Sequence, residues 1–83
     1  MNHSSKEYLM DLLSKKIDDL RERIGKLEYD LDFAKGQAAR GKTARERTMG
    51  EDGRRRFGPP LKAAQNELSK ATSALAELLA VNT

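Results

Sequence analysis

Cysteine and tryptophan are absent from this chain, and only two tyrosines and two phenylalanines are present. The lack of cysteine excludes disulfide bonds and thiolate metal sites, and it fits a reducing compartment. With only 37% hydrophobic residues, the 83-residue chain has little material for a core. A chain near this size buries only about 60% of the surface that its unfolded form exposes. We therefore expect at most one domain, which is either elongated and helical or completes its core by association.

Long apolar runs are also missing from the sequence. A membrane-spanning helix needs about 20 consecutive apolar residues, and no segment approaches that length. The first five residues are mostly polar and do not resemble a secretory signal peptide. From the sequence we expect a soluble, cytoplasmic protein with no membrane partner.

The residue combinations that carry catalysis are equally scarce. The single histidine, His3, lies in a terminus that we expect to fray, so it is poorly placed to act as a general base. No glycine-rich loop has the spacing that cradles phosphates or dinucleotides. The acidic residues Glu46, Glu51 and Asp52 lie among arginines that would neutralise them, which argues against a metal site. We therefore predict a protein that is not an enzyme and needs no cofactor or metal.

The clearest positive feature is a heptad pattern over residues 4–39. Ser4 and Glu7 have the spacing of a capping box, in which the two side chains satisfy backbone N–H groups of the first turn. The pattern predicts one long amphipathic helix, preceded by a frayed terminus over residues 1–3. The apolar seam of this helix consists of Met10, Leu13, Ile17, Leu20, Ile24, Leu27, Leu31, Ala34 and Ala38.

A second apolar seam predicts a helix over residues 59–81. Pro59 and Pro60 suit a first helical turn, because the N–H group that proline lacks would have no partner there. Because the two seams can cover one another if the chain turns back, the sequence predicts an all-α antiparallel two-helix hairpin. This hairpin resembles a coiled coil and forms a single domain. The second seam consists of Leu61, Ala64, Leu68, Ala71, Leu75 and Leu78.

Residues 40–58 are predicted to form a basic connection, because they contain Gly41, Gly50 and Gly53 and few apolar side chains. Within it, residues 43–49 either continue the first helix or form a short turn of their own. Residues 40–56 carry seven basic and three acidic side chains, a net charge of +4, whereas the whole chain carries +3. Three interpretations remain open: a solvated loop, a site that docks on an acidic protein surface, and a site for nucleic-acid phosphates. Arginine suits the second because its guanidinium binds carboxylates in a bidentate way. A basic triplet at residues 54–56 beside Phe57 suits the third.

The apolar stripes are wider than a two-helix seam can cover, above all at the open end, where the chain termini meet. The simplest additional partner is a second copy, so we predict a homodimeric four-helix bundle. A monomeric hairpin and one long parallel coiled coil are the alternatives. The predicted dimer interface consists of Leu9, Leu12, Leu13, Leu75, Leu78 and Leu79.

Tyr29 and Phe33 lie off the seam on one face of the first predicted helix. There they can pack against Phe57, pack against a second subunit or contact a partner protein. We predict a small interaction protein that binds and modulates a larger protein or assembly, as an adaptor, chaperone or inhibitor does. A nucleic-acid-binding regulator and a structural coiled-coil spacer are the alternatives. The predicted partner-binding residues are Arg45, Arg47, Arg54, Arg55, Arg56, Phe57, Tyr29 and Phe33.

Overall fold

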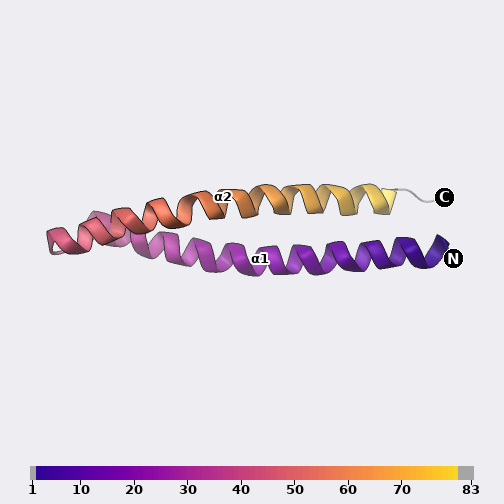
Figure 1. Cartoon of the computed structure of the whole chain (residues 1–83), viewed down its shortest axis with the longest axis horizontal. Coiled ribbons are helices and arrows are strands. Elements are labelled where there is room, and N and C mark those ends of the chain that lie inside the picture. The colour runs from indigo at the N-terminus through magenta and orange to yellow at the C-terminus, as the bar shows by residue number, and fades with distance from the viewer. Residues whose placement is uncertain (1, 81–83) are drawn as a thin grey trace.

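The computed structural model describes residues 2–80 of the chain, and the side chains of residues 5–80. Two helices, α1 (Asn2–Arg40) and α2 (Ala44–Ala80), run antiparallel and pack along their length (Figure 1). The hairpin measures 63 × 14 × 14 Å, and the start of α1 and the end of α2 lie together at its open end. The predicted all-α hairpin is therefore confirmed. The predicted helix end at residue 81 and the Ser4 side chain of the capping box lie outside the described part.

The first helix begins earlier than the sequence predicted. α1 is helical from Asn2, although a frayed segment was expected over residues 1–3 and a helix start near residue 4. The side chain of His3 lies outside the described set. Within the described part of the chain, neither helix combines the length and the apolar character needed to cross a membrane.

The core is a narrow seam between the two helices. The predicted heptad pattern places the buried residues correctly in both helices, because the heptad spacing keeps one stripe of each helix against the other. Among the described side chains, no large one is fully buried, and three of the seven core residues are alanines. The hairpin therefore has a thin core. The buried hydrophobic residues are Ile17, Leu20, Ile24, Ala34, Leu61, Ala64 and Ala71.

The basic connection predicted over residues 40–58 is wrong, because the structure turns within residues 41–43 and is helical again from Ala44. The backbone N–H of Gly41 closes α1 on the carbonyl of Gln37 at 2.8 Å. Thr43 then caps α2, because its hydroxyl oxygen accepts the backbone N–H of Glu46 at 3.1 Å. The Glu46 carboxylate in turn accepts the backbone N–H of residue 42 at 2.8 Å. This arrangement is a variant of the capping box, and it starts a helix where the sequence analysis expected a loop.

Two glycines that the sequence analysis assigned to a loop lie instead where the helices approach most closely. A Cβ atom on Gly50 would collide with the backbone nitrogen of Ala38, and one on Gly53 would lie 2.6 Å from the Cβ of Ala34. Glycine in a helix costs up to about 1 kcal/mol relative to alanine. Here the missing side chain lets the two backbones come together. Gly50 is accordingly buried.

Pro59 and Pro60 lie inside α2 rather than at its start, so the predicted helix start at residue 59 is also wrong. A proline cannot donate a backbone hydrogen bond, so the carbonyls of Arg55 and Arg56 lose their usual partners four residues on. Neither proline follows a cis peptide bond. Figure 1 shows the ribbon of α2 continuing through this region, with α1 beside it.

Candidate functional site

The five predicted arginines lie on the first turns of α2 and point in different directions. At about 100° per residue, Arg45 and Arg56 fall on one flank of the hairpin, while Arg47 and Arg54 fall on the other. Arg55 points away from α1, because Gly50 and Gly53 occupy the face that contacts α1. The structure therefore does not bring the five arginines together into one patch.

Two of these arginines have partners within the hairpin. The guanidinium of Arg47 donates to the carbonyl of Gly41 at 3.0 Å, which ties α2 to the turn. Arg54 forms an ion pair with Glu51 at 3.3 Å, and both side chains are half exposed. Exposed pairs of this kind contribute at most about 1 kcal/mol. Among the described residues, Arg45, Arg55 and Arg56 form no ion pair.

An open groove of about 400 Å³ lies between the helices near the turn, on the flank of Arg56. Ala34 and Gly53 form its floor. They leave space between the larger side chains around them, because alanine carries only a methyl group and glycine has no side chain. We call it the tip groove, and define it by Asp30, Phe33, Met49, Asp52, Arg56 and Phe57.

The exposed walls of the tip groove are apolar. Phe33 is 62% exposed and Met49 is 55% exposed, whereas Phe57 is half buried. Asp30 and Asp52 add a carboxylate from each helix, and neither forms an ion pair within the described residues. The groove thus presents aromatic and thioether surface with charged groups at its rim.

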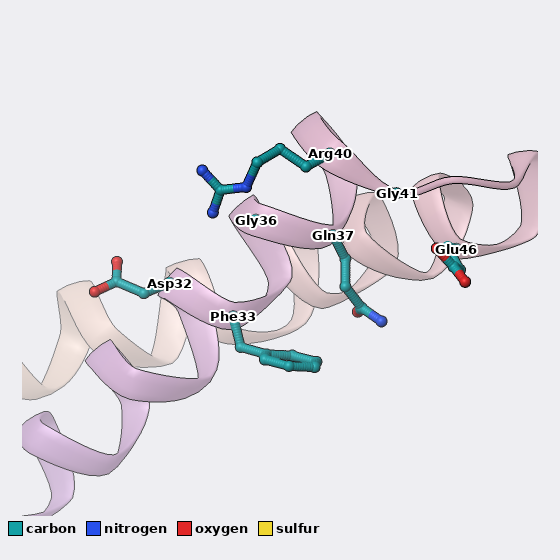
Figure 2. A pocket seen from close by; sticks show the side chains of 7 residues that line it. All are labelled: Asp32, Phe33, Gly36, Gln37, Arg40, Gly41 and Glu46. Carbon is teal, nitrogen blue, oxygen red and sulfur yellow. The ribbon is translucent and has the colours of Figure 1, made fainter.

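A second hollow, of about 300 Å³, lies on the other side of Phe33 (Figure 2). Phe33 and Gln37 project from one side of α1, whereas the side chain of Arg40 runs back along the helix over Gly36. A Cβ on Gly36 would lie 3.0 Å from a guanidinium nitrogen of Arg40, so this glycine leaves space for the arginine. Phe33 therefore borders both hollows, as Gln37 does.

The structure brings Phe33 and Phe57 into one groove but separates Tyr29 from them. Tyr29 is 74% exposed and borders a hollow on the outer face of α1, beside Gly25. Met49 was missed in the sequence analysis. Met49, Gly53 and Phe57 follow one another at intervals of four residues, which places them on one face of a helix. This pattern can be recognised only once α2 is known to start before Met49.

The six residues predicted for the dimer interface divide into two groups. Leu13 and Leu75 pack against the core of the hairpin itself, and Leu78 is half buried. Leu9, Leu12 and Leu79 are 47%, 46% and 54% exposed, so they remain available for another molecule. Tyr8, which was not predicted, is 64% exposed near the same end.

Comparison with known proteins does not assign this surface. No family model matches it, and no curated protein or solved structure is similar enough to count as a match. In the part of the chain that the structure describes, no three acidic, histidine or cysteine side chains come together as metal ligands would. The surface is therefore interpreted from its own residues.

Proposed function

We propose that this chain is a non-enzymatic helical interaction module that binds and modulates a larger protein or assembly, as an adaptor, chaperone or inhibitor does. The observation that carries the proposal is the tip groove, where Phe33 and Met49 are exposed beside Phe57 and Arg56. Aromatic residues, methionine and arginine are enriched in protein interfaces, and a few such residues dominate the binding energy. An exposed apolar surface with a charged rim has the composition of a binding site.

The remaining arginines extend this surface around the tip. Arg45 lies on the flank of the groove, and Arg55 faces solvent on the outer side of α2, where each can reach a carboxylate of a partner in a bidentate contact. An acidic protein surface fits this distribution better than a nucleic acid does. The phosphates of a duplex call for a continuous basic stripe, whereas Glu51 and Asp52 interrupt the arginines here.

We also propose that the protein works as a homodimer with four helices. The thin core supports this proposal, because no large described side chain is fully buried. Leu9 and Leu12, which are exposed at the open end, support it as well, since a second hairpin could cover them.

The proposed function is tested by capturing partners from the native cell with tagged protein. The test variant is Phe33→Ala with Met49→Ala, and the control is Tyr29→Ala, an exposed aromatic on α1 outside the groove. We expect the groove variant to lose the bound partner and the control to keep it. Retention by the groove variant would contradict the proposal. Loss of the partner on nuclease treatment, with an affinity that falls steeply with salt, would favour the nucleic-acid alternative.

A further inference from the structure

The exposed large apolar side chains of the described residues occur toward the two ends of the hairpin. Leu9 and Leu12 are exposed at the open end, and Phe33 and Met49 are exposed at the tip. Between Leu12 and Tyr29, α1 has no large hydrophobic residue that is exposed. Each end therefore offers a small apolar surface, and the two surfaces lie far apart along a molecule 63 Å long.

The two surfaces lie on the same flank of the hairpin. The buried residues Ile17 and Ile24 occupy position a of the α1 heptads, and residues a whole number of heptads apart face the same direction. Leu12 and Phe33 both occupy position c, three heptads apart. Leu9, at the neighbouring position g, shares that flank.

We propose that the tip groove is filled by a second copy of this chain, with Leu9 and Leu12 of each hairpin against Phe33, Met49 and Phe57 of the other. The two hairpins then lie antiparallel about a two-fold axis, with α1 against α1. The proposal rests on the proposed function, because it places a second copy in the same groove, and the larger partner then binds the assembled dimer rather than the groove of a single hairpin. The arginines on the opposite flank and the outer face of α2 stay exposed at both ends of the dimer for the larger partner.

The charges along α1 agree with this register. Leu12 and Phe33 lie about 31 Å apart on one helix, so facing them across the dimer puts the axis near the middle of α1. The two hairpins then overlap along most of their length. The same register sets Asp19 opposite Lys26 of the other copy. It also sets Lys16 beside Asp30, one of the two carboxylates of the tip groove that lack an ion pair.

The area available is sufficient for a stable dimer. One face of the hairpin, taken from its extents of 63 Å and 14 Å, has a footprint of about 900 Å², which is of the same order as the roughly 800 Å² of accessible surface that each partner buries in a typical stable interface. The face is therefore large enough for an interface of standard size.

The register also creates one unfavourable contact. Arg23 lies at position g near the two-fold axis and faces its own copy. Arg23→Gln should therefore tighten the dimer by about 3-fold, because it removes a like-charged contact. An arrangement with the open ends together would keep the two arginines apart and leave the affinity unchanged.

Leu79 supplies a matched control on the other flank. Two antiparallel helices are related by a local two-fold axis, so equal heptad positions of α1 and α2 lie on the same flank. With Leu61 and Leu75 at position a, Leu79 falls at e, whereas Leu9 falls at g on the opposite flank. Leu79→Ala removes an exposed leucine from the open end without touching the proposed interface.

The first experiment is sedimentation equilibrium of the full chain and its variants, with circular dichroism to confirm that each variant is helical. We expect a dimer that Leu12→Ala or Phe33→Ala weakens by about 100-fold, because the two-fold axis repeats each loss. Leu79→Ala should leave the affinity unchanged. If Leu79→Ala weakens the dimer and Leu12→Ala does not, the antiparallel register is wrong.

The second experiment is cross-linking through single introduced cysteines, which is possible because the chain contains no cysteine of its own. A short bismaleimide should link Arg23→Cys to its own copy, while Tyr29→Cys, on the outer face of α1, should stay unlinked. If the unsubstituted chain is a monomer and the variant Phe33→Ala with Met49→Ala still fails to capture the larger partner, this inference is wrong and the proposed function stands. If the unsubstituted chain is a monomer and that variant captures the partner as well as the unsubstituted chain does, both this inference and the proposed function are wrong.

Discussion

The two halves of the hairpin hold their helices together in different ways. In the open half, branched side chains such as Ile17 and Ile24 fill the seam between the helices. In the tip half, Gly50 and Gly53 lie against Ala34, and the backbones themselves approach. The first arrangement is visible as a hydrophobic heptad. The contact in the tip half consists of small residues, and a sequence rich in glycine with few apolar residues is easily interpreted as a flexible connection.

The largest effect is expected in the open half. Ile24→Ala should lower the free energy of unfolding by about 3 kcal/mol, because it removes buried methyl groups and leaves a cavity. Urea denaturation at a fixed protein concentration measures this change. Tyr29→Ala, on the exposed outer face, should change it by less than about 0.5 kcal/mol. A loss below about 1 kcal/mol for Ile24→Ala would mean that the heptad seam is not the core.

A smaller loss is expected from one added methyl group in the tip half. Gly50→Ala should cost about 2 kcal/mol, because the new Cβ would collide with the backbone of α1. The matched control is Gly25→Ala in α1, where an added Cβ would meet nothing within 4 Å outside its own stretch of helix. That variant should gain about 0.5–1 kcal/mol from the higher helix propensity of alanine. If both variants gain stability, the helices do not approach closely at the tip.

The prolines offer a test with the opposite sign. If α2 runs through Pro59, then Pro59→Ala should stabilise the protein by about 1–2 kcal/mol, because the carbonyl of Arg55 regains a donor. Part of this gain in stability is offset, because the unfolded chain has more conformational entropy with alanine than with proline. Thermal and urea unfolding both report the change. A neutral or destabilising result would place the start of the helix at the proline.

The smallest expected effect concerns the cap that starts α2. Thr43→Ala should cost about 1 kcal/mol, because the backbone N–H of Glu46 loses its acceptor. Thr48→Ala is the matched control, since the hydroxyl of Thr48 only donates to the carbonyl of Ala44 within the helix. Equal effects of the two substitutions on urea unfolding would argue against capping at Thr43.

The hairpin could be predicted because its evidence is local and repetitive. Residues such as Ile17 and Leu61 recur at heptad spacing, and that spacing alone determines which face of each helix is buried. The first half of α2 could not be recognised in the same way. Its glycines are favourable only where Ala34 and Ala38 lie opposite, a fact of tertiary packing that overrides helix propensity. The cap formed by Thr43 and Glu46 was the one local signal of that helix.

The candidate site was predicted in part for the same reason. Phe33 and Phe57 stood out as rare aromatics, and the structure places both in the tip groove. Met49 was missed because the sequence analysis did not treat residues 44–58 as helical, whereas Tyr29 shares a face of α1 with Phe33 but does not line the tip groove. The directions in which the five arginines point could not be predicted either, because they follow from the helical conformation of the same residues.

The most direct test of the account is amide hydrogen exchange across residues 46–58 in the intact protein. The account rests on this segment being helical and packed on α1, because only then do Met49 and Phe57 line a groove with Phe33. We expect its amides to be protected like those of residues 61–71 in the core of the hairpin. Exchange at the rate of an unstructured peptide throughout residues 46–58 would restore the flexible basic connection and contradict the tip groove.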